Sequence, residues 1–380
     1  MTIACKSSHS RNLSIQGEIM NINSLKIGDL IAKIPIIQGG MGIGISLSSL
    51  AAAVANEGGI GVLSAAGVGM LEPDLYNNFV EANKRALIRE IRRARELTQG
   101  ILGVNVMTAL SNFSDMVSVA VKEGIDIIFS GAGLPLNLPQ FLDETTKTKL
   151  VPIVSSGRAA KIIIKKWLEK YNYIPDAIVV EGPLAGGHLG FSKENINNPD
   201  YSLEKIVPEV ISVAKEFEEK HNKRIPVIAA GGIYNGEDIY KIMQLGADGV
   251  QLGTRFVTTN ECDASLDFKN AYINSVKDDI VIINSPVGMP GRAIRNKFID
   301  EVNEGKKQPF KCPFHCIKTC DIQSSPYCIS LALVNAQKGN FNLGFAFAGE
   351  NAYKTNEIVS VKELMNSLVE GYESAAASAK

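Results

Sequence analysis

Residues 225–256 of the chain read IPVIAAGGIYNGEDIYKIMQLGADGVQLGTRF, and this stretch decides the fold. The apolar, β-branched run Ile225–Ala229 predicts a strand that ends at Gly231-Gly232. Apolar residues at helical spacing then predict a helix, and Gly249–Leu252 predicts a second strand that ends at Gly253-Thr254. Two successive strand–glycine units of this kind can form the late-strand phosphate site of a (β/α)8 barrel. Two tight turns without a ligand are the alternative.

The pattern of this stretch continues toward the N-terminus. Short apolar runs predict further strands near residues 34, 60, 102, 126, 150 and 177, with helices between them. Eight strand–helix units favour an α/β fold of the TIM (β/α)8 barrel type over an open doubly wound sheet. A hairpin over Leu25–Lys33 is expected to close the bottom of the barrel.

The chain is expected to form one domain with three parts. Residues 1–23 are interpreted as a polar N-terminal tail, and residues 24–262 as the barrel. Residues 263–380 are predicted to be a C-terminal extension of helices and loops packed on the barrel. Within it, the glycine- and proline-rich stretch SPVGMPGRAIRN (285–296) predicts a loop.

The composition limits the range of partners and compartments. Lys and Arg number 39 against 40 Asp and Glu, so the net charge is −1 and neither nucleic acid nor an anionic membrane is expected as a partner. No apolar run has signal-peptide or transmembrane length, and six cysteines in 380 residues do not suggest a disulfide framework. We therefore expect a cytoplasmic protein.

Several strand ends carry residues suited to a site. Gly39-Gly40-Met41 exposes backbone on which a flat ring can lie, although a plain turn explains it equally well. Asn105 offers a side-chain amide to a ligand, and capping of the following helix is the alternative role. Gly186-Gly187-His188 places an imidazole beside two glycines, and we favour a functional role over a structural one. No Walker motif or nucleophile elbow occurs, so a singly phosphorylated cofactor such as FMN fits best.

Five motifs in order make the interpretation more specific: PIIQGGMG, GVNVM, EGPLAGGH, PVIAAGGI and GVQLGTRF. Together they resemble the nitronate monooxygenase, or 2-nitropropane dioxygenase, superfamily, which includes flavin-dependent enoyl-ACP reductases and certain NADH:quinone reductases. The resemblance implies an FMN-binding barrel with His188 at the flavin ring as the catalytic residue. It implies FMN contacts at Gly40, Met41, Asn105, Glu181, Gly186, Gly187, Gly232, Gln251, Leu252, Gly253 and Thr254.

The leading functional hypothesis is oxidation of an alkyl nitronate with O2. The alternative enzyme is an NAD(P)H-dependent FMN enoyl-ACP reductase acting on an acyl thioester, and the non-enzymatic alternative is a flavin-binding sensor. Glu181 and Arg255 resemble the reductase branch, whereas the long segment near residues 284–330 argues against it. A neutral nitroalkane needs a base such as His188, with an ordinary pKa of ~6.5, while a nitronate is already an anion.

Four cysteines near the end of the chain are the remaining candidate site. Cys312, Cys316, Cys320 and Cys328 have the spacing C-x3-C-x3-C-x7-C, which matches no common zinc or iron–sulfur pattern. A helix beginning at Pro313 would align the first three on one stripe. Packing as small apolar side chains explains them too, and we predict no bound metal.

Overall fold

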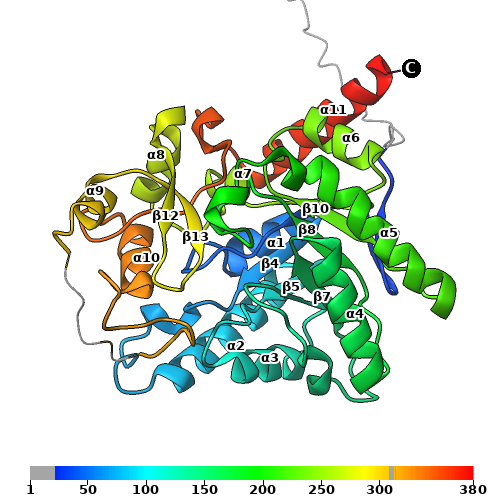
Figure 1. Cartoon of the computed structure of the whole chain (residues 1–380), viewed down its shortest axis with the longest axis horizontal. Helices are drawn as coiled ribbons and strands as arrows, with labels where there is room; N and C mark the ends of the chain where they lie inside the picture. Colours follow the sequence, from blue (N-terminus) through cyan, green and yellow to red (C-terminus); the bar gives the residue numbers. More distant parts are fainter. Residues whose placement is uncertain (1–21, 308–311, 313, 380) are drawn as a thin grey trace, which may run out of the picture.

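The computed structural model describes residues 22–307, 312 and 314–379. Its centre is a closed barrel of eight parallel strands in the order β10-β11-β3-β4-β5-β6-β7-β8, which confirms the predicted fold class. Several of these strands are labelled at the centre of the molecule in Figure 1. The strands are short and almost fully buried, as expected for parallel strands covered on both faces. Their bounds are β3 Ile36–Gln38, β4 Ile60–Ser64, β5 Ile101–Asn105, β6 Ile127–Ser130, β7 Lys149–Val154, β8 Ile178–Glu181, β10 Val227–Ala230 and β11 Gly249–Leu252.

Helices cover the outside of the barrel after most strands. These are α1 Ser48–Asn56, α2 Phe79–Leu97, α3 Phe113–Lys122, α4 Gly157–Tyr171, α5 Leu203–His221 and α6 Gly236–Gln244, whereas β11 is followed directly only by the single turn α7 Thr254–Val257. The expected helix between β6 and β7 is absent from the described residues, and the 3-10 helix η2 (Leu138–Phe141) stands there instead. Pro135 and Pro139 lie in this connection, and proline interrupts helical hydrogen bonding.

The bottom of the barrel is closed by the predicted hairpin, β1 Leu25–Ile27 and β2 Leu30–Ala32. Leu25, Ile27 and Ala32 belong to the same buried cluster as the barrel interior. Asp29 in the turn pairs with Lys149 at the start of β7, with Nζ and Oδ1 2.6 Å apart. Of the expected polar tail, residues 1–21 lie outside the described part of the chain, whereas Ile22 is buried.

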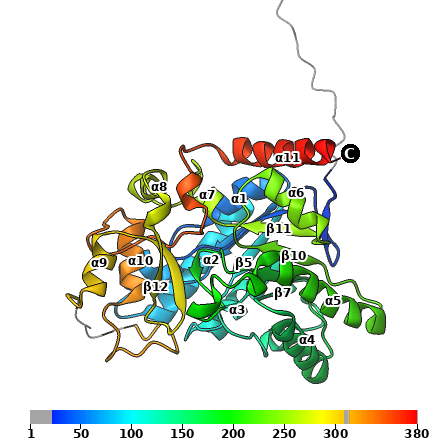
Figure 2. The same cartoon turned by 45° about the horizontal axis from the view of Figure 1, so that its top comes forward.

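The last helix, α11 (Val361–Ser378), lies beside α6 and α1 on the outer ring of the barrel (Figure 2). The contact with α6 is close: a Cβ on Gly236 would lie 2.2 Å from the backbone nitrogen of Tyr372. Because α6 follows β10 and α1 follows β3, α11 occupies the place of the helix that should follow β11. We call the intervening residues 258–360 the mouth insertion, since they separate the eighth strand from its outer helix.

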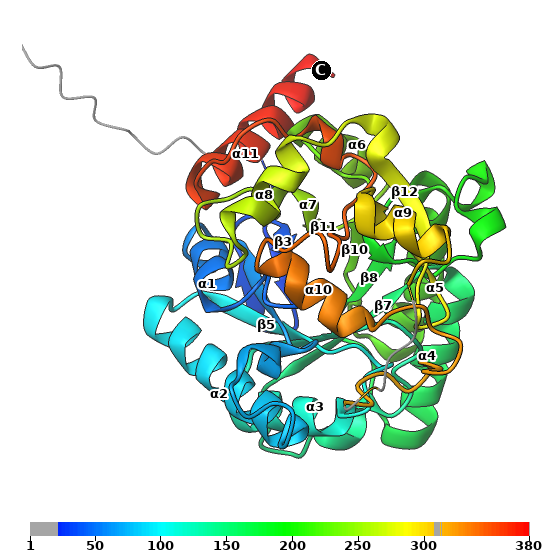
Figure 3. The ribbon, with the colours of Figure 1, turned by 90° about the vertical axis from the view of Figure 1, so that its left-hand side faces the viewer.

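The mouth insertion covers the carboxyl ends of the strands, and α10 crosses the opening of the barrel (Figure 3). Its elements are α8 Leu266–Ile273, β12 Ile280–Asn284, β13 Pro290–Ile294, α9 Lys297–Asn303 and α10 Ile329–Gln337. The loop predicted over residues 285–296 is therefore wrong in its second half. There β13 pairs with β12 on one side and with β9 (Gly187–His188) on the other.

Candidate active site

A cavity of about 300 Å³ lies at the carboxyl ends of the barrel strands, beneath the mouth insertion. This is the end of a (β/α)8 barrel where active sites are built. All of the residues that the sequence analysis assigns to cofactor binding or catalysis line this one cavity. They are Gly40, Met41, Asn105, Glu181, Gly186, Gly187, His188, Gly232, Gln251, Leu252, Gly253 and Thr254.

Backbone forms the wall of the cavity at the ends of β3, β8, β10 and β11, which are neighbours in the barrel. Gly40 shows why the wall needs glycine: a Cβ there would lie 2.4 Å from the Cβ of Asn105. Gly232 has φ +85° and would place a Cβ 2.9 Å from the Cβ of Leu184. Only glycine combines this left-handed backbone with so close an approach.

Three consecutive residues of the mouth insertion bind three of these loops. The Gly349 N–H donates to Thr254 Oγ1 over 3.0 Å, and the Glu350 N–H donates to the Leu184 carbonyl over 3.1 Å. The Asn351 side-chain amide donates to the Gly232 carbonyl over 2.6 Å. The loops after β8, β10 and β11 are therefore held by a single short segment.

Arg292, on β13, anchors the loop after β8 from inside. The side chain is 2% exposed. Its Nη1 donates to the carbonyls of Pro183 and Ala185, over 2.6 and 2.7 Å. Its Nε lies 2.9 Å from Glu350 Oε2, so the buried charge is paired as well as hydrogen-bonded.

His188 is positioned by the mouth insertion. Its backbone pairs with Gly291 of β13, its Nε2 lies 2.7 Å from Ser285 Oγ, and its ring packs edge-on against Phe347 at 4.9 Å between centroids. Burial disfavours the charged form and lowers the pKa of His188 to about 4. The imidazole is therefore neutral at pH 7, and it is a weaker base than the ordinary pKa suggests.

Glu181, at the end of β8, is the carboxyl group that lines the cavity. Burial raises its pKa to about 7, so both the acid and the carboxylate are populated near neutral pH. Among the described residues around the cavity there is no lysine or arginine. The site therefore holds two half-buried titratable groups, with pKa values shifted in opposite directions, and no lysine or arginine among the described lining residues.

Sequence reasoning missed the residues that the mouth insertion supplies: Ser285, Arg292, Phe347, Gly349, Glu350 and Asn351. Ser285 and Arg292 lie in the stretch that its glycines and prolines marked as a loop. The alternation of aromatic and small residues in FAFAG (345–349) was the available signal for a segment packed against the site. Nothing in the sequence indicates that Arg292 is buried.

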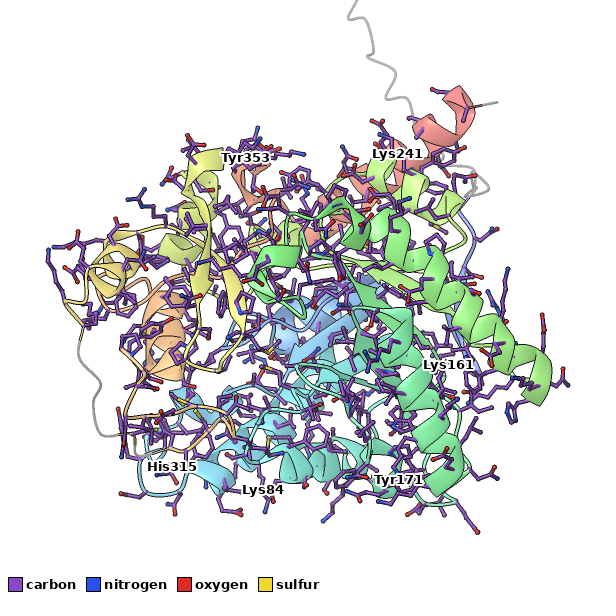
Figure 4. All side chains as sticks on the ribbon, in the orientation of Figure 1. Lys84, Lys161, Tyr171, Lys241, His315 and Tyr353 are labelled. Atoms are coloured by element: carbon purple, nitrogen blue, oxygen red, sulfur yellow. The ribbon has the colours of Figure 1, made fainter. Side chains whose placement is uncertain are left out.

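The described cysteines do not lie on one helix, since residues 314–320 contain no helix, while Pro313 itself lies outside the described residues. Cys316 is buried, lines the cavity and lies 3.1 Å from Ser330 Oγ. His315 is exposed, on the periphery of the molecule (Figure 4). No three His, Cys, Asp or Glu side chains of the described residues are grouped so as to hold a metal ion. That the protein binds no metal stays a prediction for elemental analysis.

The donors around the cavity fit a flat, singly phosphorylated cofactor. The glycine loops offer a side-chain-free wall for a ring, and backbone N–H groups that approach an anion closely. Asn105 and Gln251 add amides, and Thr254 adds a hydroxyl. A closed barrel with such a wall is the architecture of the barrel flavoenzymes, a class of oxidoreductases.

The comparison with known families agrees with this class. The model of the family described as nitronate monooxygenase matches residues 23–371. The chain belongs to the nitronate monooxygenase family, and it is an oxidoreductase.

Individual relatives and structures support the same assignment. A protein of Staphylococcus saprophyticus named probable nitronate monooxygenase is 28% identical over 75% of this chain and 82% of its own length. A protein of the same name from Staphylococcus aureus strain Newman is 30% identical over 71% of this chain and 78% of its own length. The structure of FabK from Thermotoga maritima superposes with a TM-score of 0.70 and 26% identity, covering 92% of this chain and 95% of that one. Nitroalkane oxidase from Streptomyces ansochromogenes shares the fold, with a TM-score of 0.69 and 22% identity. The superposition covers 91% of this chain and 98% of that one.

In the part of the chain that the structure covers, no helix is both long enough and apolar enough to cross a membrane.

Proposed function

We propose that the protein is an FMN-dependent nitronate monooxygenase that oxidises alkyl nitronates with O2. The backbone around Gly232, Gly253 and Thr254 would hold the phosphate of FMN, and the wall at Gly40, Asn105 and Gly186 would take the ring. The remaining proposed contacts are Met41, Glu181, Gly187, Gln251 and Leu252. Bound FMN would supply the two-electron chemistry that the side chains of a protein lack.

The surroundings of His188 are the observation that carries the proposal, since its Nε2 lies 2.7 Å from Ser285 Oγ and its ring packs edge-on against Phe347. A substrate that arrives as a neutral nitroalkane must lose its α-proton to a base matched to the working pH. With its pKa lowered to about 4, His188 is poorly matched to that task. A nitronate needs no such base, and its negative charge beside the ring would raise the pKa of His188 and strengthen a hydrogen bond between them.

The rest of the lining agrees with a small substrate that carries a single charge. No lysine or arginine of the described residues lines the cavity, so His188 and backbone N–H groups would have to bind the charge of the substrate. Glu181, with its pKa raised to about 7, can be uncharged when an anion enters. The mouth insertion lines the cavity and leaves it open to a ligand.

The test compares a nitronate with its parent nitroalkane on the purified flavoprotein. We expect kcat/KM for the nitronate to exceed that for the nitroalkane by about 100-fold or more, the scale of an absent general base. His188→Ala should lower nitronate turnover through the lost hydrogen bond, and His188→Gln, which keeps a donor, should restore part of it. Equal kcat/KM for the two nitro substrates in the wild type would overturn this interpretation of His188.

The alternative function is NAD(P)H-dependent reduction of an enoyl thioester. The extensive match to FabK of Thermotoga maritima favours it, as does the presence of Glu181 and Arg255 in the motifs. A crotonyl thioester with NADH and NADPH, assayed beside the nitronate, separates the two. Thioester reduction without nitronate oxidation would establish the alternative.

A further inference from the structure

The loops after β10 and β11, which would hold the phosphate of FMN, are backed by a second layer of side chains that does not line the cavity. This layer consists of Tyr234, Arg255 and Lys354. They belong to the loop after β10, to α7 and to the short segment of the mouth insertion, which Gly349 and Asn351 join to these loops by hydrogen bonds. The second layer is therefore attached to the same backbone that faces the proposed phosphate.

Contacts with Tyr234 fix the positions of the two cations in this layer. Arg255 lies over the tyrosine ring, with Cζ 4.6 Å from the centroid, and Lys354 Nζ lies 5.6 Å from the same centroid. Arg255 Nη1 donates to the Tyr234 hydroxyl over 2.9 Å, and this hydroxyl donates to Thr355 Oγ1 over 3.2 Å. One aromatic ring therefore holds two positive charges beside the loops.

No carboxylate of the described residues forms an ion pair with either cation. Arg255 is held by a neutral hydroxyl and a ring, and Lys354 by rings alone. The carboxylate of the neighbouring loop, Asp238, caps α6 instead, because it accepts hydrogen bonds from the Tyr234 and Asn235 N–H groups. Two positive charges are therefore uncompensated within the part of the chain that the structure describes.

The guanidinium of Arg255 also keeps a donor in reserve. Its Nε is buried and lacks a hydrogen-bond partner, and among the described residues it is the single buried side-chain nitrogen or oxygen of this kind. A buried donor without an acceptor is costly, so native structures rarely keep one. The residue is half-buried, where a charge acts more strongly than it does in water. An unpaired cation with a spare donor is suited to a nearby anion.

We infer that Arg255, assisted by Lys354, supplies the positive charge by which the site selects FMN over a flavin without phosphate. This inference rests on the proposed function for the identity of the cofactor. A phosphate monoester carries about −1.5 to −2 charge at pH 7, whereas the cavity lining offers it only neutral groups and partial charges. Because Arg255 does not line the cavity, it is a positioning residue whose charge acts across the backbone of Thr254.

The experiment compares FMN with riboflavin, which has the same ring and ribityl chain but no phosphate. The full-length holoprotein is diluted, and the fluorescence of the released flavin gives the Kd of FMN. Exchange with excess riboflavin, followed by the same dilution, gives the Kd of riboflavin. In Arg255→Met we expect the FMN Kd to rise about tenfold or more, while the riboflavin Kd stays within about twofold of the wild type.

Three further variants show whether the effect depends on charge. Lys354→Met should raise the FMN Kd only about threefold, because this cation is exposed to solvent. Arg255→Lys keeps the charge and should recover most of the affinity for FMN. The matched control is Lys241→Met in the last turn of α6, which removes an exposed cation paired with Glu237 at 2.7 Å and should leave both Kd values unchanged.

The possible outcomes separate the inference from the proposed function. Equal losses of FMN and riboflavin affinity in Arg255→Met would mean that the residue only supports the loops, and an unchanged FMN Kd would mean that its charge does not reach the phosphate. Either result would overturn the inference. A protein with the expected FMN preference that oxidises no nitronate would overturn the proposed function alone. A wild type that binds neither flavin would overturn both.

Discussion

The cavity has two halves that are built in opposite ways. The glycine half lies at the ends of β3, β8, β10 and β11, and the apolar half is walled by side chains such as those of Met70, Leu110 and Leu333. In the glycine half the ligand-facing surface is backbone, and a single Cβ at Gly40 or Gly232 would collide with neighbouring atoms. In the apolar half the surface is side chains, many of them from the mouth insertion. One half needs glycine at fixed positions, whereas the other is defined by the side chains that it carries.

Under the proposed function, the glycine half would hold the cofactor and the apolar half would contact the substrate. The glycine half depends on the geometry of the barrel strands, so its residues follow the fold. The apolar half lies between the barrel loops and an insertion, where residues can change without disturbing the barrel. Substitutions in one half, or in the contacts that join the mouth insertion to it, can therefore test the two roles separately.

The largest expected effect is loss of the flavin in Gly232→Val. The branched side chain meets both the left-handed backbone, φ +85°, and the Leu184 side chain, so the loop after β10 must move. Flavin released per protein on denaturation should fall to near zero. Gly124→Val is the matched control, since Gly124 also has positive φ, +68°, but faces open space away from the cavity. Full flavin occupancy in Gly232→Val would place the phosphate site elsewhere.

Arg292→Met tests whether the mouth insertion holds the glycine half in place. The variant removes the donor to the Pro183 and Ala185 carbonyls and leaves Glu350 without its partner. We expect the free energy of unfolding in urea to fall by about 3 kcal/mol, the lower end for a broken buried pair because Glu350 is 33% exposed. Arg295→Met, just past the end of the same strand, removes an exposed pair with Asp300 and should leave stability unchanged. Equal losses in the two variants would contradict the anchoring role.

The pH dependence of stability tests the burial of His188. Its pKa is about 4 in the folded protein against an ordinary value of 6.5, so the unfolded chain takes up the proton first as the pH falls. The contribution of neutral His188 to the free energy of unfolding is complete above pH 6.5. It is lost as the pH falls toward 4, by up to about 3 kcal/mol. Glu181 acts in the opposite sense, because its pKa of about 7 in the folded protein lies above the ordinary value of 4.5. Its contribution to stability is complete below pH 4.5 and is lost as the pH rises to 7.

The two opposing contributions require a difference measurement. Urea unfolding of flavin-free wild type and His188→Gln between pH 4 and 8 isolates the His188 contribution. The wild type should lose stability relative to the variant as the pH falls below 6.5. Parallel curves would mean that the imidazole is not desolvated.

The smallest expected effect belongs to Ser285→Ala. This variant removes the hydroxyl 2.7 Å from His188 Nε2 without disturbing the strand pairing of His188 with β13. A single neutral hydrogen bond is worth about 1 kcal/mol, so nitronate kcat/KM should fall about fivefold. A loss as large as that of His188→Ala would mean that Ser285 itself contacts the substrate.

Much of the barrel could be predicted because strand, glycine turn and helix alternate with few interruptions. The strand Gly249–Leu252 is found with the predicted bounds. The prediction of a helix between β6 and β7 was wrong, because the prolines in this connection leave only the 3-10 helix η2. The role of α11 could not be predicted, since the mouth insertion separates this helix from β11 and sequence order alone does not show which helix closes the ring.

The candidate site divides in the same way. The residues of the glycine half could be predicted, since a glycine pair after a buried strand marks a place where backbone faces a ligand. Arg292 could not, because β13 begins with Pro290-Gly291, a pair that normally indicates a turn. Ser285 lies between β12 and β13, so its place beside His188 depends on the same strand pairing. What makes this stretch a strand is pairing with β9 and β12, which lie far apart from each other in the sequence.

Anaerobic mixing of the purified flavoprotein with a nitronate, and separately with NADH and NADPH, tests the central claim most directly. The visible absorbance of the flavin follows its reduction in each case. We predict that a nitronate such as that of 1-nitrobutane reduces the flavin within the time of a catalytic turnover, while NADH and NADPH leave it oxidised. Reduction by NADH or NADPH with no response to any nitronate would contradict the account and assign the protein to the reductases.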